Sequence, residues 1–542
     1  MSMRDKEMMH CTFDKAQYLL GQDVRIRLPG GAVPAEVAVY RLEQAIPCDW
    51  RAEDGELVLP ALSCGCYGVS VKAGQGVWEG AFDVVEDHRQ VIRYGFLTDF
   101  STQDAGGGAV EWMCGLHLNA VQFYDWMYRH DRLLPPKTRY EDPMGRSTDL
   151  DVIAKKIELC RRRGMRPFAY GAVYAATRDT FREHPEWGMY TMDGEPMTFA
   201  GWLYYMNIAP ECGWSGHLAG EYRKAIAFGF AGIHMDTYGF PKHVWDGQGR
   251  PLELAEEFPK LIARAAETVR REDPDGGVIF NAVNNWPVEA VADAAQDAVY
   301  IEVWPPNDTY FDLYALIRQA RLRSGRNVVL AAYLKPFQLE DVPAAERAFR
   351  LAWAVICASG GTQLVLGEKQ GVLRDSYYVN YATFRPEFLP VVQNYCDFLV
   401  RYGDLLYNDQ GTDVSRTAAG GINEDVCFSS DTAGFSSGGE ADRVWTILRE
   451  SKQRLTVHLI NLQGNDGRWN EPKAEPARTG GIRIHFRLDR PVKGFYCASP
   501  DAQSLRAAEL PYAVRNTAQG RIYDVEVPEV RYWTAVWAQL EG

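Results

Sequence analysis

The stretch Gly229-Phe-Ala-Gly-Ile-His-Met-Asp-Thr-Tyr-Gly239 decides the fold that this sequence predicts. A short apolar strand, Ala231–Met235, is expected to deliver Asp236 at its carboxyl end and to break at once into a glycine-containing loop. A carboxylate at the end of a buried parallel strand is typical of the sites found in barrel enzymes. The stretch therefore predicts a parallel sheet with a chemically active edge.

Seven further apolar segments resemble this one and alternate with helical patterns, as expected of a parallel sheet with crossover helices. Two helical segments, 151–163 and 254–271, carry apolar residues at three-to-four spacing with charges opposite. Eight such units over about 300 residues favour a (β/α)8 TIM barrel over a doubly wound open sheet. No Gly-x-Gly-x-x-Gly follows the first strand, which counts against a nucleotide-binding sheet. The expected strands are Tyr94–Thr98, Ala120–Tyr124, Arg166–Gly171, Ala231–Met235, Val278–Ala282, Ala298–Val303, Val328–Tyr333 and Gln363–Leu366.

The residues on both sides of the barrel alternate apolar and polar side chains at period two, the pattern of antiparallel strands. Examples are Asp23–Leu28 before the barrel and Arg443–Arg449 and Arg454–Asn461 after it. We therefore expect a multidomain chain: an N-terminal immunoglobulin-like β-sandwich over 1–89, a barrel over 90–411 and a C-terminal β-sandwich over 412–542. The Gly-Ser-rich stretch 434–439 is expected to be a loop.

Composition restricts the classes of partner. The 542 residues are 46% hydrophobic and 24% charged, as in soluble globular proteins. Lys and Arg total 58 against 72 Asp and Glu, a formal charge of -14, so neither a nucleic acid nor an anionic membrane is an expected partner. A neutral substrate fits better, and the oligomeric state is left open.

The cysteines and the N-terminal residues indicate the cellular compartment that we expect. The eleven Cys are scattered without the paired spacing of zinc sites, which favours reduced thiols over a disulfide framework. The first residues lack the apolar core of a signal peptide, and no stretch approaches the ~18 apolar residues of a membrane span. We expect a cytoplasmic protein, or a secreted one if the sequence is a trimmed form.

Polar and aromatic side chains cluster where the expected strands end, and in a barrel these ends share one mouth. The candidates are poor in metal ligands: His234 shares a strand face with Asp236, but the ten His are scattered and zinc needs three or four convergent ligands. No Gly-x-Ser-x-Gly marks a serine nucleophile. We therefore expect neither a metal nor a cofactor. The candidate site residues are Asp99, Asp125, Trp126, Tyr174, His234, Asp236, Tyr238, Asn281, Glu302, Trp304, Lys335 and Glu368.

Asp236 and Glu302 are the leading catalytic pair. Glycoside hydrolysis needs one carboxylate at the anomeric carbon and one carboxylic acid to protonate the leaving oxygen, roughly 5 to 6 Å apart in retaining enzymes. Glu302 should have a pKa raised by burial against Trp304 and by the charge of Asp236, while His234 or Tyr238 could keep Asp236 ionised. The competing interpretation is that each carboxylate only caps a helix or pairs with an arginine.

Four motifs resemble glycoside hydrolase family 66, the dextranases and cycloisomaltooligosaccharide glucanotransferases: Arg93-Tyr-Gly-Phe-Leu-Thr-Asp-Phe, Asn119-Ala-Val-Gln-Phe-Tyr-Asp-Trp, Gly229-Phe-Ala-Gly-Ile-His-Met-Asp and Tyr300-Ile-Glu-Val-Trp. The resemblance implies an endo-acting, retaining enzyme on α-1,6-linked glucan. It also implies that Asp236 is the nucleophile, Glu302 the acid/base and Asp125 a further essential carboxylate that holds sugar hydroxyls.

The sequence departs from this family in one respect. The glucanotransferases carry a carbohydrate-binding module late in the barrel, whereas Tyr333–Gln363 has room for a strand end, one helix and the next strand. We therefore expect hydrolysis of dextran or isomalto-oligosaccharides rather than cyclisation. Two alternatives remain: a transglycosylase making cyclic or longer isomalto-oligosaccharides, and a non-catalytic glucan-binding protein.

Overall fold

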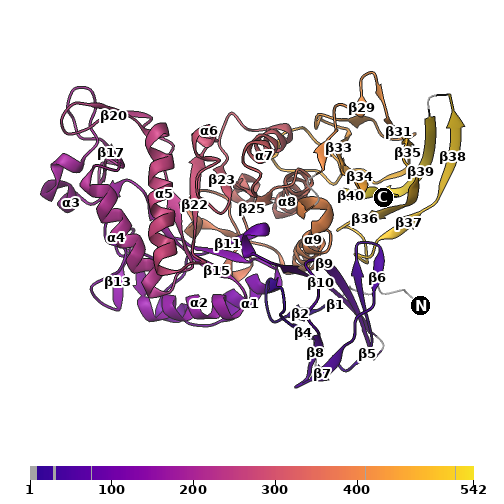
Figure 1. Cartoon of the computed structure of the whole chain (residues 1–542), viewed down its shortest axis with the longest axis horizontal. Coiled ribbons are helices and arrows are strands. Elements are labelled where there is room, and N and C mark those ends of the chain that lie inside the picture. Colours follow the sequence, from indigo (N-terminus) through magenta and orange to yellow (C-terminus); the bar gives the residue numbers. More distant parts are fainter. Residues whose placement is uncertain (1–8, 29–31, 75, 409–410, 519, 542) are drawn as a thin grey trace.

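A computed structural model describes residues 9–28, 32–74, 76–408, 411–518 and 520–541 (Figure 1). A central barrel of eight parallel strands is accompanied by N-terminal and C-terminal domains built mainly of antiparallel sheets, which confirms the predicted fold class. Figure 1 places the indigo N-terminal domain and the yellow C-terminal domain on the same side of the barrel. Helices and loops of the barrel domain itself lie on its opposite side.

The barrel strands pair in chain order, and each expected strand overlaps an observed one. The sheet closes through a parallel bridge between Phe96 and Gly367, with the Phe96 N–H donating to Leu366 O at 3.2 Å. This closure excludes the open doubly wound sheet, which would keep two free edges. The last strand is shorter than predicted, and Leu366 also forms an antiparallel bridge to Val372 of the short strand Gly371–Val372. The strands are β11 (Tyr94–Leu97), β12 (Ala120–Phe123), β15 (Arg166–Ala172), β19 (Gly232–Asp236), β22 (Gly277–Val283), β23 (Val299–Glu302), β24 (Val328–Ala331) and β25 (Thr362–Gln363).

Helices follow the strands and cover the outside of the barrel (Figure 1). Both helices expected from periodicity are present, as α2 and α5. Local signals set their limits: the Asp149 carboxylate accepts from the Asp151 N–H at the start of α2, and α7 ends at Gly325 in the left-handed conformation. The helices are α1 (Gly108–Gly115), α2 (Leu150–Arg162), α3 (Arg178–Glu183), α4 (Gly213–Phe228), α5 (Leu254–Glu272), α6 (Val288–Val291), α7 (Tyr310–Ser324), α8 (Val342–Ala358) and α9 (Leu389–Arg401).

Two long connections at the carboxyl ends of β15 and β19 carry small sheets of their own. Their strands gather at the far left of Figure 1, away from the C-terminal domain. A two-stranded antiparallel sheet also follows each of β12 and β25. The strands are β13 (Arg139–Glu141), β14 (Ser147–Asp149), β16 (Ala175–Ala176), β17 (Thr198–Phe199), β18 (Leu203–Tyr205), β20 (His243–Trp245), β21 (Pro251–Glu253), β26 (Gly371–Val372) and β27 (Ala382–Thr383).

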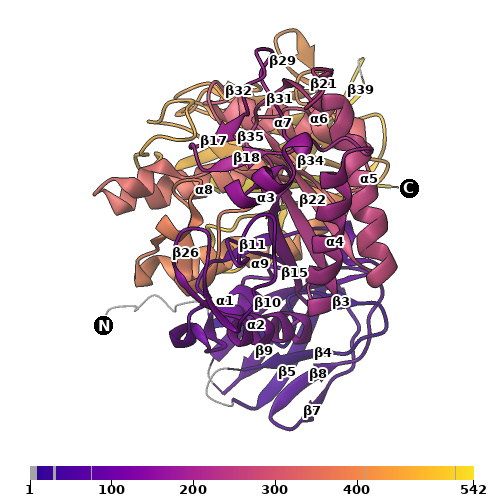
Figure 2. The same cartoon turned by 90° about the vertical axis from the view of Figure 1, so that its left-hand side faces the viewer.

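The N-terminal domain contains two sheets (Figure 2). Its apolar core includes Phe13, Tyr18 and Phe82. In β4, burial alternates along the strand as its period-two pattern predicts. One sheet contains β1 (Met9–His10), β3 (Tyr18–Leu19), β5 (Pro34–Arg41), β6 (Gln44–Ile46), β9 (Gly65–Ala73) and β10 (Gly76–Val85); the other contains β2 (Thr12–Phe13), β4 (Val24–Arg27), β7 (Arg51–Glu53) and β8 (Glu56–Leu59).

The C-terminal domain also contains two larger sheets. The expectation that 434–439 is only a loop is wrong at two residues, because Phe435 and Ser436 form a short strand beside β33, where the Phe435 ring stacks on Phe428. One sheet contains β28 (Thr412–Asp413), β32 (Phe435–Ser436), β33 (Val444–Glu450), β34 (Arg454–Asn461), β36 (Val492–Ala498), β37 (Ala508–Leu510) and β40 (Trp533–Leu540); the other contains β31 (Val426–Ser429), β35 (Thr479–Arg487), β38 (Tyr512–Thr517) and β39 (Gly520–Val530), with β29 (Ala419–Gly420) and β30 (Asn423–Glu424) as a ribbon.

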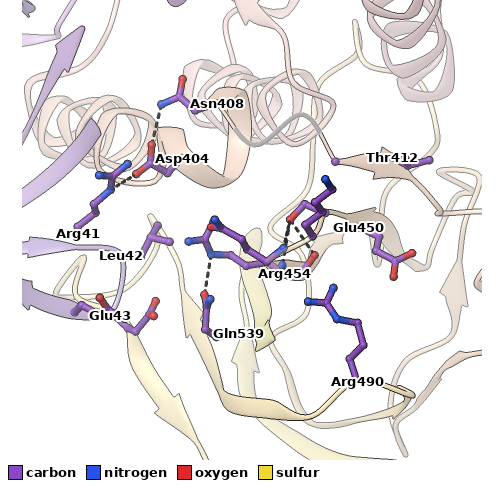
Figure 3. A pocket seen from close by; sticks show the side chains of 15 residues that line it. Arg41, Leu42, Glu43, Asp404, Asn408, Thr412, Glu450, Arg454, Arg490 and Gln539 are labelled. Carbon is purple, nitrogen blue, oxygen red and sulfur yellow. Dashed lines mark hydrogen bonds and ion pairs between the residues drawn. The ribbon is translucent and has the colours of Figure 1, made fainter. Parts of the chain in front are cut away.

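Polar contacts join the domains. Arg350 on α8 forms a buried ion pair with Asp501 of the C-terminal domain at 2.6 Å. Arg41 of the N-terminal domain pairs with Asp404 at 2.8 Å beside a cavity of about 970 Å³ that also reaches Arg454 (Figure 3). This junction cavity contains none of the predicted strand-end site residues.

All eleven cysteines are free thiols. Among the described residues, none of the helices combines the length and the hydropathy that a membrane-spanning helix needs.

Candidate active site

A cavity of about 630 Å³ opens at the carboxyl ends of the barrel strands. It brings together seven of the twelve predicted site residues, from four strand ends that are far apart in sequence. These are Asp125, His234, Asp236, Tyr238, Asn281, Glu302 and Trp304.

Asp236 ends β19 and is half-buried, with both carboxylate oxygens hydrogen-bonded. The Tyr170 hydroxyl donates to Oδ2 at 2.7 Å, and the Asn281 amide donates to Oδ1 at 2.7 Å. Burial raises the pKa of Asp236 to about 6, and these hydrogen bonds oppose the rise. The donors proposed from the sequence were wrong: His234 bonds to the Tyr94 hydroxyl, and Tyr238 stacks on Phe199.

Glu302 ends β23 and is buried. The Tyr333 hydroxyl donates to Oε1 at 3.0 Å, and the Asn281 amide donates to Oε2 at 3.0 Å. Burial, followed by the charge of Asp236, raises the pKa of Glu302 to about 7. Burial raises this pKa as expected, and a hydrogen bond from Trp304 favours the ionised form.

Asn281 joins the two carboxylates. Its single amide nitrogen donates to Asp236 Oδ1 at 2.7 Å and to Glu302 Oε2 at 3.0 Å. Those two oxygens are therefore less than about 6 Å apart, which suits the ~5 to 5.5 Å between carboxyl groups in retaining glycosidases. Its backbone is held by the Thr237 hydroxyl, which donates to Asn281 O at 2.9 Å. Asn281 thus sets the spacing of the pair, a position that the sequence interpretation treated as a substrate contact.

Asp125 supplies a third carboxylate to the cavity. It follows β12 with a φ of 50° and is buried, and within the described ranges no side chain or backbone group donates a hydrogen bond to it. Burial raises its pKa to about 7, although the charge of Arg146 opposes the rise. Its oxygens face the cavity with acceptor capacity unused, which suits a ligand rich in hydroxyl groups.

Two predicted aromatic residues lie behind the cavity rather than in it. Trp126 is fully buried, and its indole N–H donates to Tyr170 O at 3.1 Å. The Tyr174 hydroxyl accepts from the Tyr238 N–H at 2.6 Å and donates to Phe240 O at 3.1 Å. Both residues support groups that line the cavity.

Three predicted polar residues also lie outside the cavity lining. Glu368 turns back into the barrel wall, where Oε1 accepts from the Thr98 and Asp99 N–H groups at 2.7 and 2.9 Å. The Asp99 carboxylate pairs with Lys369 at 2.6 Å. Lys335 is exposed, and its backbone N–H donates to Asn470.

Sequence reasoning missed several tyrosines inside the barrel, above all Tyr170. It lies within β15, directly beside His234 of β19 in the parallel register. The two rings stack with centroids 6.2 Å apart. Its position in the third expected strand could have identified Tyr170. Residues paired with His234 on the neighbouring strand point to the same barrel interior. Tyr333, at the end of the seventh expected strand, lines the cavity as that position predicts. Other lining residues outside the predicted set include Gln122, Tyr124, His130, Phe199, Trp202, Tyr300, Tyr377 and Tyr378.

In the described part of the chain, no three His, Cys, Asp or Glu side chains are grouped so as to hold a metal ion. The arrangement is a pair of carboxyl groups with raised pKa values and a shared amide donor. Such a pair suits general acid and nucleophilic chemistry on a hydroxyl-rich substrate.

Comparison with known proteins gives the family. The profile of glycosyl hydrolase family 66 matches residues 13–537. The chain belongs to glycosyl hydrolase family 66. This confirms the resemblance drawn from the four motifs, and the match extends beyond the barrel into both flanking domains.

Enzymes of two kinds are similar in sequence to this chain. A cycloisomaltooligosaccharide glucanotransferase of Niallia circulans is 24% identical over 97% of this chain and 71% of its own length. A dextranase of Streptococcus salivarius is 23% identical over 64% of this chain and 48% of its own length. A crystal structure of a Paenibacillus sp. cycloisomaltooligosaccharide glucanotransferase complexed with cycloisomaltoheptaose superimposes with a TM-score of 0.88 at 21% identity, covering 98% of this chain and 99% of that one.

Proposed function

We propose that this family 66 enzyme cleaves α-1,6-glucosidic linkages with retention of configuration, through a covalent intermediate on Asp236. The observation that carries the proposal is the shared amide of Asn281, which holds Asp236 and Glu302 within reach of one glycosidic bond. The names of the relatives supply the linkage, because dextranase and cycloisomaltooligosaccharide glucanotransferase both denote action on isomaltose-type chains.

The two carboxyl groups would act in sequence. An Asp236 oxygen attacks the anomeric carbon while the bond from that carbon to the leaving O6 breaks, and the Glu302 proton passes to O6. Glu302 then takes a proton from the incoming hydroxyl, whose oxygen attacks the anomeric carbon and releases Asp236. The raised pKa of Glu302, about 7, supports its role as the acid, because part of the population keeps the proton at neutral pH.

The molecule that attacks the covalent intermediate decides the reaction: water gives hydrolysis, and a glucan hydroxyl gives transfer of the glycosyl group. We propose transfer to a glucan hydroxyl, giving cyclic or longer isomalto-oligosaccharides, as the main outcome. The support is similarity: the glucanotransferase of Niallia circulans matches 97% of this chain, whereas the dextranase matches 64%. This preference replaces the hydrolysis expected from the sequence.

Hydrolysis is the second candidate, and one observation favours it. Between β24 and β25 the chain forms only a short 3-10 turn, Lys335–Gln338, and α8. No inserted module occupies this fully described connection, where the resemblance placed one in the glucanotransferases.

The products decide between the two outcomes. We expect isomalto-oligosaccharides incubated with the enzyme to give cyclic or longer products by mass spectrometry, with α-configured anomeric signals by NMR. Glu302→Gln, which keeps the size of the side chain, is the inactive control. Shorter α-configured fragments alone would support hydrolysis, β-configured products would overturn retention, and binding without turnover would indicate a non-catalytic glucan-binding protein.

A further inference from the structure

The long connection between β15 and α4 places an aromatic ring at the edge of the catalytic cavity. Its β17–β18 hairpin turns through Ala200 and Gly201, both with positive φ, and the Trp202 N–H donates to Phe199 O at 3.2 Å. Trp202 lines the cavity, yet 39% of its surface is exposed. A tryptophan fixed by a tight turn and still open to solvent is a common arrangement for binding a ligand face.

A second exposed ring lies on the loop after β19. Phe240 is 49% exposed, and its centroid is 6.3 Å from that of Phe199. Phe199 in turn stacks on Tyr238 at 4.3 Å, and Tyr238 lines the cavity two residues after Asp236. The rings therefore form a continuous path from the carboxylates to the surface.

Contacts with neighbouring residues hold this path in place. The Tyr174 hydroxyl bonds to the backbone of both Tyr238 and Phe240, which fixes the loop that carries the outer ring. Trp202 packs against His130, with ring centroids 6.1 Å apart. The exposed rings are thus presented by fixed backbone at the far-left end of the barrel, where β17 and β20 gather in Figure 1.

We propose that Trp202 and Phe240 are stacking positions for glucose units of the α-1,6-glucan beyond those at the scissile bond, so that they determine preference for chain length. The proposal rests on the proposed function. The cavity of about 630 Å³ lies within the ~300 to 1,000 Å³ of small-molecule sites, so a longer chain must continue across its rim. The apolar face of a glucose ring matches an exposed aromatic face, and the chain's hydroxyl groups remain in water.

Chain-length dependence tests the proposal. We would measure kcat/KM on isomaltotriose and isomaltoheptaose for the wild type, Trp202→Ala, Trp202→Phe and Phe240→Ala. The matched control is Leu339→Ala, an exposed apolar residue (54% exposed) on the connection after β24 that does not line the cavity. We expect Trp202→Ala to lower kcat/KM about tenfold on the heptaose, mainly through KM, and less than about twofold on the triose, as loss of one aromatic contact implies. Trp202→Phe should recover most of the loss.

A binding measurement separates stacking from catalysis. In the Asp236→Ala background, calorimetric titration with isomaltoheptaose should give a weaker affinity when Trp202→Ala is added and an unchanged one when Leu339→Ala is added. Equal losses on both chain lengths, or no loss, would overturn the inference while leaving the proposed function intact. A wild type that neither cleaves nor binds these sugars would refute the proposed function, and the inference with it.

Discussion

At the scale of single residues, burial raises the pKa of both carboxyl groups of the catalytic pair. Asp236 accepts from Tyr170 and Asn281, and Glu302 accepts from Tyr333 and Asn281 and also experiences the charge of Asp236. The pKa values are raised to about 6 for Asp236 and about 7 for Glu302. The roles assigned to the two residues can be distinguished chemically.

We predict opposite stereochemical outcomes for azide rescue of the two alanine variants. Each variant should lose about 10² to 10⁴-fold or more in kcat on an activated glucoside or isomalto-oligosaccharide. Azide added to Glu302→Ala should give a glycosyl azide of retained configuration, because the intermediate still forms on Asp236. Azide added to Asp236→Ala should give the inverted azide, since it enters the empty nucleophile position. NMR of the products gives the configurations, and a swap would mean that the roles are reversed.

We also predict that Asn281 tunes both carboxyl groups. Its hydrogen bonds lower the pKa of Asp236 and of Glu302, so Asn281→Ala should move both limbs of the pH profile of kcat/KM to higher pH. Loss of one preorganised donor should also reduce kcat about 10²-fold. A change confined to KM, with an unmoved pH profile, would instead identify Asn281 as a substrate contact only.

The sequence could place Asp236, Glu302 and Asn281 at strand ends, because apolar strands and their breaks are local patterns. It could not identify Tyr170 as a donor to Asp236, since that contact depends on the register between β15 and β19. It also misjudged His234, whose strand face was right but whose ring bonds to Tyr94 across the barrel. Such partners are set by barrel closure, which no local pattern encodes.

At the scale of elements, the clearest example is the closure between β11 and the segment after β25. Glu368 has the sequence position of a site residue, but it is fully buried and accepts hydrogen bonds from Thr98 and Asp99. Lys156, also buried, lies 3.6 Å from it. The sequence cannot separate this role from substrate binding, because both place a carboxylate at a strand end.

We predict that Glu368 stabilises the barrel rather than the substrate. Glu368→Ala removes a buried hydrogen-bonded charge and leaves Lys156 without its carboxylate, so the free energy of unfolding should fall by about 3 to 5 kcal/mol. Urea denaturation measures this loss. Glu289→Ala, an exposed carboxylate on α6, is the control and should stay within about 0.5 kcal/mol of the wild type. An unchanged stability with a lower kcat/KM for Glu368→Ala would contradict the assignment.

At the scale of the whole molecule, periodicity predicted a barrel between two β domains, because strand and helix patterns are continuous along each part of the chain. How the domains pack could not be predicted. The buried pair of Arg350 and Asp501 joins residues 151 positions apart, and Arg350 also lies over the Tyr532 ring at 3.6 Å. No local sequence pattern marks either Arg350 or Asp501 as a residue that contacts another domain.

The site also affects stability of the whole chain, because Asp125, Asp236 and Glu302 all have raised pKa values. Between pH ~4 and ~7 the folded state keeps protons that the unfolded state has lost. The stability that these groups contribute is therefore present below about pH 4 and is lost as the pH rises through their folded-state pKa values. The catalytic arrangement is thus least favourable to folding at neutral and higher pH.

We predict that Asp125→Asn stabilises the protein at pH 8 but not at pH 4. The amide cannot ionise, so it removes the cost of a buried charge whose pKa is raised to about 7, and Asn tolerates the positive φ at this position. The expected rise in Tm at pH 8 is on the order of 2 °C by differential scanning calorimetry. Asp397→Asn is the control of opposite sign: bonds from His10 and His117 lower the pKa of Asp397, so its ionised form stabilises the fold at pH 8 and the variant should melt earlier. A Tm of Asp125→Asn that is equal to or below that of the wild type at pH 8 would mean that Asp125 has a stabilising partner, and that its carboxylate is not held ready for a ligand.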